Sequence, residues 1–381
     1  MRTLYIAAFV FSFQVALTAY VNSSLLETSV GENGIGLLYA IASITSIVGL
    51  VFIPHIIRKI GNKHTMVGVL VASAAILGLI VSHSFFIPLL VFYIAANTMT
   101  FFLFDIFIEH YAKIKTMGAS RGIYLTIINL GWIASPMIAG WLTTHGGFET
   151  VYIVAMFFVL ATALIIGSIL HTFKDTNYRR ENMGAACGEV ASEPHLRRIF
   201  SINFALQFFY AWMVIYAPIY LHQTIGLGWE TIGILFTIML VPFILFEYPV
   251  GWLIDKGFSP RKILSFGLIC MTLALFLFVP AATHSVLAIG AILFLSRIGS
   301  SIVESTVEVL FFKHVSKRHA DVISLYRDAH PCAYLIAPLA GTAIIAFSRI
   351  ETLFIILGCL LGLLLLYIAF KRRYVLTHPH Q

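Results

Sequence analysis

The chain has 381 residues, of which 60% are hydrophobic and 11% are charged, and its formal net charge is +7. Soluble domains carry about 25% charged residues, so this composition excludes a soluble domain and predicts a protein that crosses the membrane many times. The basic residues lie scattered in short loops between apolar segments. They therefore indicate membrane topology and contact with anionic lipid, and no nucleic-acid partner is expected.

Twelve apolar segments are long enough to cross a membrane as helices. They cover about 3–25, 34–57, 65–82, 86–112, 120–143, 150–172, 197–222, 230–254, 262–282, 285–313, 320–347 and 351–371. A polar stretch with small residues separates the sixth segment from the seventh and is predicted to be a linker. The sequence therefore predicts an all-α membrane protein with a six-helix bundle at 1–172, a cytoplasmic linker at 173–196 and a second six-helix bundle at 197–381.

The basic residues also set the predicted orientation in the cell membrane. With the N-terminus in the cytoplasm, every Lys and Arg except Arg297, Arg327 and Arg349 falls in or next to a cytoplasmic loop. Cytoplasmic loops carry an excess of Lys and Arg, so both termini are predicted to be cytoplasmic. Arg349 lies in the last outer loop, Arg327 near the cytoplasmic end of the eleventh segment, and Arg297 near the middle of the membrane.

An internal repeat relates the two sets of six segments. The sequence IGLLYAI at 35–41 reappears as IGILFTI at 232–238, which is 197 residues later. In the same way, IASPMIAG at 133–140 is echoed by LIAPLAG at 335–341, and their prolines are 202 residues apart. Because each set crosses the membrane an even number of times, the two halves are predicted to share one orientation and to be related by an axis along the membrane normal.

The loop after the eighth segment reads GWLIDKGFSPRK at 251–262. This stretch resembles the loop motif of the major facilitator superfamily, glycine-x-x-x-aspartate-basic-x-glycine-basic-basic. The resemblance implies twelve spans in two six-helix halves, a central cavity lined by the first, fourth, seventh and tenth spans, and a transport function. The corresponding loop after the second segment, PHIIRKIGNK at 54–63, has Arg58 where the family has the aspartate. The charge contact that the family makes from that aspartate is therefore in question in the first half.

The loop motif also predicts a cytoplasmic gate. Its glycines permit a close approach of helices and a tight turn, and Asp255 can pair with a basic residue in the loop or with a charge on a neighbouring helix. An arginine lies at the cytoplasmic end of the fifth segment and another at that of the eleventh. We predict a gate that opens and closes during transport and that consists of Glu247, Gly251, Asp255, Arg261, Arg121 and Arg327.

Two pairs of acidic residues lie inside apolar segments. They are Asp105 with Glu109 and Glu304 with Glu308, and they are separated by 199 residues, which places them at equivalent points of the repeat. The pKa of a carboxyl group rises with burial or beside a like charge and falls beside an arginine. One member of each pair is therefore a candidate proton carrier. The alternative is that all four acids form salt bridges of the gate, with Lys113, Arg121, Lys313 and Arg327 as partners.

Arg297 is the residue that we predict to bind the substrate. Its equivalent in the first half is Asn97, 200 residues earlier, so the second half has a cation where the first has an amide. A guanidinium inside the membrane is costly unless it faces protein or water, and its planar fork suits a carboxylate or phosphate. Glu304, two turns away on the same helical face, is the competing partner. Further candidates for substrate binding are Gln14, Asn129, Trp132, Gln207 and Tyr210.

These features predict a secondary transporter that moves a small solute, with an anion favoured by Arg297, by alternating access. A proton is the expected coupling ion, and sodium held by carboxylates and hydroxyl groups is the alternative. A drug or metabolite efflux antiporter is the second reading, because GWIASPMIAG at 131–140 looks like a relaxed antiporter motif. A receptor or scaffold that has lost transport is the third. The sequence has no phosphate-binding loop and no catalytic motif, so we expect a monomer that is not an enzyme and needs no cofactor.

Overall fold

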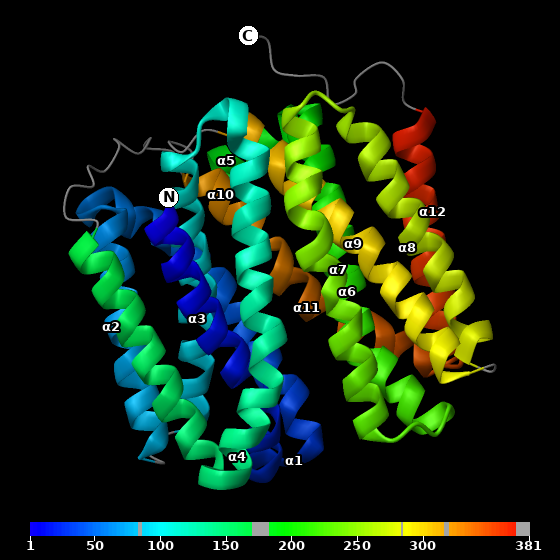
Figure 1. The fold of residues 1–381 in the computed structure, drawn as a ribbon, viewed down its shortest axis with the longest axis horizontal. Helices are drawn as coiled ribbons and strands as arrows, with labels where there is room; N and C mark the ends of the chain where they lie inside the picture. Colours follow the sequence, from blue (N-terminus) through cyan, green and yellow to red (C-terminus); the bar gives the residue numbers. More distant parts are fainter. Residues whose placement is uncertain (83–85, 170–182, 283–284, 316–319, 371–381) are drawn as a thin grey trace. The chain divides into compact units, whose positions relative to one another are not determined.

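The computed structural model describes residues 1–82, 86–169, 183–282, 285–315 and 320–370, and these residues form helices and short connections without a strand (Figure 1). In chain order the elements are α1 (Arg2–Ile60), α2 (Asn62–Val81), α3 (Phe86–Tyr111), η1 (Ile114–Thr116), α4 (Met117–Ile169), α5 (Met183–Ser192), α6 (Pro194–Ile219), η3 (Tyr220–Thr224), α7 (Trp229–Asp255), α8 (Pro260–Ala282), α9 (Val286–His314), α10 (Ala320–Arg327), α11 (Ala329–Ile345) and α12 (Glu351–Phe370). Within the described residues, eleven helical stretches are long and apolar enough to cross a membrane. The prediction of an all-helical protein with many membrane spans is confirmed.

Two of the helices carry two spans each. α1 contains the stretches Arg2–Ala19 and Leu38–Ile60, and α4 contains Met117–Thr143 and His145–Ser168. Inside α4 the helical conformation is interrupted at Gly147, whose φ of 72° lies in the left-handed region. Glycine adopts this region without strain because it has no Cβ. Gly147 therefore provides the turn between the fifth and sixth predicted spans.

The predicted eleventh span, 320–347, consists of two helices, α10 and α11, which meet at Asp328. Pro331 accounts for the break. A proline has no N–H group, so it cannot donate to the carbonyl oxygen four residues earlier, which belongs to Arg327. The backbone stays hydrogen-bonded on both sides, because the N–H of Asp328 donates to Ser324 O at 3.0 Å and the N–H of Cys332 donates to Asp328 O at 3.0 Å.

The predicted linker also contains a helix. Residues 170–182 lie outside the described part of the chain, and the next ten residues form α5, Met183–Ser192. This stretch has three alanines, which favour a helix, and two glycines, which do not; sequence reading treated it as uncommitted. α5 ends just before Pro194, and a proline disfavours helical backbone in the residue that precedes it. α6 then begins at Pro194, a position in the first turn where the missing N–H costs nothing.

The chain forms two compact units, and each takes a short segment from the other half of the sequence. Unit 1 comprises Met1–Ala112, Ile127–Glu189 and Val315–Cys332. Unit 2 comprises Lys113–Thr126, Val190–His314 and Ala333–Gln381. The two exchanged segments correspond in the repeat, since one precedes and opens the fifth predicted span and the other the eleventh.

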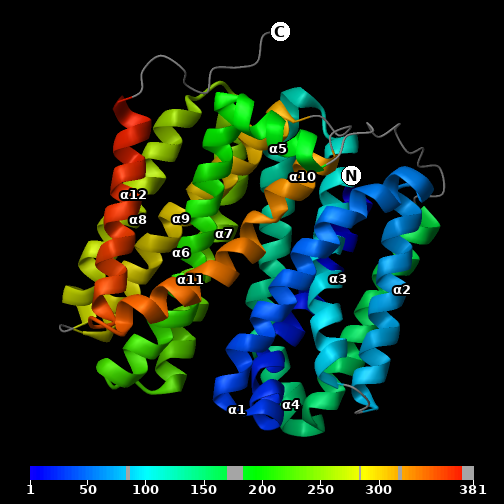
Figure 2. The same ribbon diagram turned by 180° about the vertical axis from the view of Figure 1, so that it is seen from behind.

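Each unit has its own helix packing. In unit 1, α3 packs against α1 and α2, and α10 packs against α1 and α3. Figure 2 shows α10, in orange, beside the blue end of α1. In unit 2, α9 packs against α6, α7 and α8, while α12 packs against α8 and η1 packs against α7. The exchanged segments are therefore packed parts of the units that receive them.

Candidate functional site

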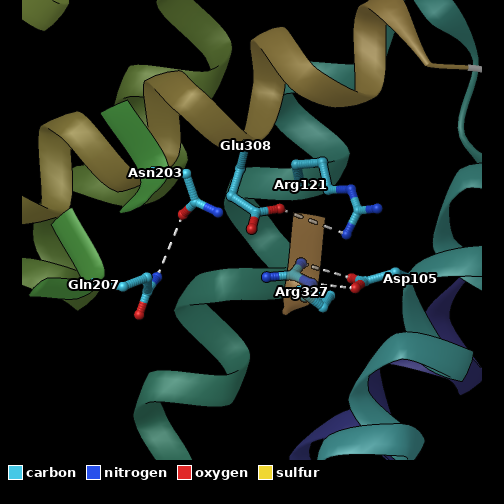
Figure 3. Close-up of polar contacts among 6 residues, drawn as sticks. All are labelled: Asp105, Arg121, Asn203, Gln207, Glu308 and Arg327. Carbon is cyan, nitrogen blue, oxygen red and sulfur yellow. Dashed lines mark hydrogen bonds and ion pairs between the residues drawn. The ribbon is translucent and has the colours of Figure 1, made fainter. Parts of the chain in front are cut away.

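The exchanged segment of unit 1 is held by an ion pair inside the protein. Arg327 of α10 binds Asp105 of α3 through two hydrogen bonds, from Nε to Oδ2 at 2.5 Å and from Nη2 to Oδ1 at 2.9 Å (Figure 3). Asp105 is fully buried. A bidentate guanidinium–carboxylate pair is strong and has a fixed geometry. It therefore ties the start of the eleventh predicted span to the fourth.

The exchanged segment of unit 2 carries the equivalent arginine, but its surroundings differ. Nη1 of Arg121 lies 3.9 Å from Oε2 of Glu308 on α9 (Figure 3). The guanidinium carbon lies 3.1 Å from the centre of the Phe312 ring and 5.6 Å from that of Tyr124. A cation over an aromatic face is attracted by the ring quadrupole. Arg121 therefore lies closer to an aromatic ring than Arg327, whose guanidinium carbon is 5.4 Å from the ring centre of Tyr326.

The two arginines engage different members of the acid pairs. Arg327 binds the first acid of its pair, Asp105, whereas Arg121 approaches the second, Glu308. We call Arg327–Asp105 and Arg121–Glu308 the gate pairs. Each joins an arginine from one half of the sequence to an acid from the other half, within one compact unit.

The aspartate of the loop motif binds the start of α4. Asp255 accepts hydrogen bonds from the backbone N–H of Gly118 at 3.1 Å and of Ala119 at 2.7 Å, and Nζ of Lys313 lies 2.8 Å from its Oδ1. The N–H groups at a helix start have no partner within the helix, and the helix dipole also favours a negative charge there. A Cβ on Gly251 would overlap the backbone of Gly118, so both glycines are needed for this close approach.

In the first half, a side-chain ion pair occupies the corresponding place in the repeat. Arg58 precedes Asp255 by the 197 residues of the repeat, and its Nη1 donates to Oδ2 of Asp321 at 2.8 Å. Asp321 lies in the first turn of α10 and follows Ala119 by 202 residues, the second spacing of the repeat. The motif resemblance put the first-half contact in question, and sequence reasoning did not select Asp321. The repeat spacing was the signal that could have found it.

The Arg58–Asp321 ion pair predicts rescue by a charge swap. Breaking a mostly buried pair leaves an unpaired charge, so Arg58→Asp and Asp321→Arg should each lower the free energy of unfolding by about 2–4 kcal/mol. The double variant should lie within about 1 kcal/mol of the wild type. Unfolding of the purified protein in detergent measures both. Lys59→Asp combined with Asp321→Arg is the matched control, because Lys59 is exposed; rescue by that combination as well would show that net charge alone decides.

Arg297 is buried in unit 2, with 3% of its surface exposed. Its guanidinium carbon lies 5.4 Å from the ring centre of Phe209 and 5.5 Å from that of Tyr210 on α6. Its Nε has no hydrogen-bond partner among the described residues. Glu304, the competing partner, accepts a hydrogen bond from the hydroxyl of Tyr210 at 2.6 Å. Tyr210 thus contacts the cation with its ring and the acid with its hydroxyl group.

The corresponding place in unit 1 is polar and uncharged. Nε2 of Gln14 on α1 donates to Oδ1 of Asn97 on α3 at 3.3 Å. The hydroxyl of Tyr93 donates to Oε1 of Gln14, and it lies 3.1 Å from the hydroxyl of Thr18. All four side chains are buried. The buried amides here satisfy each other, which is the usual requirement for buried polar groups.

Two positions of the first polar site have counterparts in the second. Asn97 precedes Arg297 by 200 residues, and Gln14 precedes Tyr210 by 196. In unit 1 this pair of positions is joined by a hydrogen bond, and in unit 2 by the contact of a guanidinium with an aromatic ring. Of these paired positions, the one that carries a charge is Arg297 in the second site, and this charge could attract a charged ligand.

Two predicted gate residues have other contacts. Arg261 donates to the carbonyl oxygen of Ala369 at the end of α12 and makes no bond to Asp255 in the described part of the chain. Glu247 is buried on α7, and its carbonyl oxygen accepts a hydrogen bond from Oγ of Ser305 at 2.9 Å. Arg261 therefore fastens the second-half loop to α12, while the backbone at Glu247 helps to pack α7 against α9.

The remaining predicted residues are dispersed over both units. Asn129 and Trp132 lie half-buried on α4, in unit 1, and Glu109 is buried on α3. In unit 2, Nε2 of Gln207 donates to Oδ1 of Asn203, one turn earlier on α6, at 3.4 Å (Figure 3).

The sequence matches the model of the Major Facilitator Superfamily over residues 4–235 and again over residues 199–380. The chain belongs to the major facilitator superfamily. Members of this superfamily are membrane transporters, so the prediction of a secondary transporter that is not an enzyme is confirmed at this level.

Solved structures of other transporters share the fold. The human organic anion transporter MFSD10 (TETRAN) has a TM-score of 0.80 at 14% identity, over 96% of this chain and 98% of that one. The E. coli fucose:proton symporter FucP has a TM-score of 0.78 at 17% identity, over 98% of each chain. A bacterial homologue of the iron transporter ferroportin has a TM-score of 0.74 at 14% identity, over 97% and 99%. No curated protein matched the chain in sequence.

Proposed function

We propose that this transporter moves a small organic anion across the cell membrane, that Arg297 binds the anionic group, and that protons drive the movement. The proposal is carried by one observation, the buried guanidinium of Arg297, which lies over two aromatic rings and whose Nε has no partner among the described residues. A charge inside the membrane-spanning part is costly and is a functional candidate by default. A carboxylate or phosphate would supply the countercharge.

The residues around Arg297 favour a ligand with one anionic group and an apolar or aromatic body. The guanidinium fork can bind a carboxylate through two hydrogen bonds. The rings of Phe209 and Tyr210 supply apolar contact area. Glu304 is held by Tyr210, and its carboxylate repels a second negative charge nearby. We therefore favour monoanions over dianions as substrates.

The names of two structural relatives are consistent with this proposal but are not evidence for it. MFSD10 is named an organic anion transporter and FucP a fucose:proton symporter. At 14% and 17% identity these proteins support the fold alone. The proposed binding of an anion therefore rests on Arg297, and the proposed coupling to protons rests on the buried carboxyl groups of this chain.

In the proposed cycle the gate pairs close the cytoplasmic side. Arg327 in the second half binds Asp105 in the first, and Arg121 in the first half approaches Glu308 in the second. A movement that separates the two predicted six-helix halves at these residues would break both pairs. Alternating access then means that these pairs form and break in turn, with both chain termini in the cytoplasm.

An efflux antiporter is the weaker alternative. Its support was the resemblance of the fifth predicted span to an antiporter motif, and Gly131 is the first residue of that stretch. A Cβ at Gly131 would overlap Oγ of Ser12 and the backbone of Phe13. Close packing of α4 on α1 therefore explains this glycine without reference to the direction of transport.

A ligand screen tests the proposed function. The purified protein is heated in the presence of a panel of small monocarboxylates, dicarboxylates, organic phosphates and neutral sugars. A ligand that binds the folded state raises the melting temperature, and the increase grows with its concentration. We expect monoanions to give the largest shifts. Shifts by neutral sugars alone would overturn the proposal.

A further inference from the structure

Asp328 is a buried acid that sequence reasoning did not select. It lies at the joint of α10 and α11 and is 5% exposed. Its Oδ1 has no hydrogen-bond partner, and its carboxyl group forms no ion pair in the described part of the chain. A buried carboxylate without a countercharge is costly, whereas the neutral acid is far less so. The surroundings of Asp328 therefore favour the form that carries a proton.

Three of the four acids that were predicted to carry protons, Asp105, Glu304 and Glu308, have different surroundings. Asp105 and Glu308 each face an arginine, and Glu304 accepts a hydrogen bond from Tyr210. Opposite charges and donated hydrogen bonds stabilise the ionised form of a carboxyl group. These three groups therefore have the contacts expected for structural pairing or ligand binding. Asp328 has neither kind of support.

The helices around Asp328 offer no unengaged cation that the structure describes. α10 packs against α1 and α3, and α11 follows it in the chain. Tyrosines aside, the charged or titratable residues that these helices bury, half-bury or place next to the joint are Arg58 on α1, Asp105, Glu109 and His110 on α3, Asp321 and Arg327 on α10, and His330 and Cys332 on α11. The nearest buried tyrosine is Tyr326 on α10. Both arginines of this set are already bound to other carboxylates.

We propose that Asp328 is the proton-binding site of the transport cycle and that it holds its proton while α10 is bound to α1 and α3. This inference rests on the proposed function for its role in transport, although proton binding itself can be tested without a substrate. The proton is taken up when the carboxylate becomes a carboxylic acid, and no other reactant is needed. If α10 leaves its position and Asp328 meets water, the ionised form gains hydration and the proton can be released. Proton binding is thereby linked to the state of the Arg327–Asp105 gate pair.

The pH dependence of stability tests proton binding directly. An acid that is protonated in the folded protein but ionised in the unfolded chain contributes stability that is lost as the pH rises. The variant Asp328→Asn keeps the shape of the acid and cannot ionise. Its melting temperature should match the wild type at about pH 5 and exceed it by about 2–4 °C or more at about pH 9. A difference that does not change with pH would overturn the proposal.

The matched control is the same substitution at Asp105, a fully buried acid bound by an arginine. Asp105→Asn should lower the melting temperature at neutral and high pH, which is the opposite of the effect expected at Asp328. If Asp328→Asn does not yield folded protein, chemical labelling of the wild type decides. Dicyclohexylcarbodiimide adds to protonated carboxyl groups in apolar surroundings, and mass spectrometry locates the product. Label should appear on Asp328 and decline as the pH rises, and its absence there at about pH 5 would contradict the proposal.

Transport separates the failure of this inference from the failure of the proposed function. Proteoliposomes are loaded with a monoanion that binds in the ligand screen. Wild-type protein should take up protons together with this anion. Asp328→Asn should still exchange anion across the membrane, but under a proton gradient it should accumulate at least about tenfold less anion than the wild type. Proton-driven accumulation by Asp328→Asn would overturn the role in coupling. If no anion binds, the proposed function fails, while the stability and labelling results still decide whether Asp328 binds a proton.

Discussion

Replacing Asp105 by asparagine will destabilise the transporter by about 3–5 kcal/mol, because it leaves the guanidinium of Arg327 without its countercharge inside the protein. Asp105 is fully buried and holds that guanidinium through two hydrogen bonds of 2.5 Å and 2.9 Å. Chemical unfolding in detergent, followed by tryptophan fluorescence, measures the loss. Because removing both charges avoids the unpaired one, Asp105→Asn combined with Arg327→Gln should recover part of the lost stability.

Glu308→Gln is the matched control for this prediction. Its carboxylate is also buried, but it lies 3.9 Å from Arg121, whose guanidinium keeps its contact with the Phe312 ring when the acid is removed. The loss at Glu308 should therefore be smaller than the loss at Asp105. Equal losses in the two variants would show that the two gate pairs do not differ in the way their geometry indicates.

Replacing Arg297 by glutamine will weaken the binding of a monoanion by about 100-fold without lowering the stability of the ligand-free protein. The loss of affinity follows from the loss of the guanidinium that attracts the anion. Stability is retained because the Arg297 guanidinium forms no ion pair among the described residues, so that its removal mainly removes a desolvation cost. Arg297→Lys keeps the charge but loses the planar fork, so its affinity should fall by about tenfold. Titration calorimetry and thermal unfolding measure the two quantities.

The combination of effects distinguishes a binding site from a structural ion pair. If Arg297 were paired with Glu304 for stability, Arg297→Gln would destabilise the ligand-free protein by several kcal/mol, on the order of 3–5 kcal/mol. Arg349→Gln, the same change at an exposed arginine before α12, should alter neither affinity nor stability. A destabilised Arg297→Gln variant that still binds anions would contradict the assignment.

The repeat made much of the architecture predictable from the sequence. Spacings of 197 to 202 residues related the two halves, and the acid pairs and the Asn97–Arg297 equivalence followed from the same numbers. The choice of partners could not be predicted in this way. Arg121 and Arg327 both begin a span near two acids, and only the packed structure shows that one binds the first acid and the other approaches the second.

Two further features depended on local geometry that the apolar pattern does not carry. The eleventh predicted span is apolar enough to read as one helix, yet it is broken at Asp328, and this break accompanies the buried acid. Arg58 was read as a departure from the loop motif. Its pairing with Asp321 depends on where α10 begins. Pro331 indicated the break at Asp328, and the repeat spacing indicated Asp321 as a partner. The burial of Asp328 and the Arg58–Asp321 pair are seen only in the packed structure.

The central claim is that Arg297 receives the anionic group of the substrate. An experimental structure with the best monoanion from the ligand screen tests it most directly. We predict density for the anionic group within about 2.7–2.9 Å of the guanidinium nitrogens, with the body of the ligand against Phe209 and Tyr210. A ligand bound elsewhere, with Arg297 paired to Glu304 in the same structure, would contradict the claim.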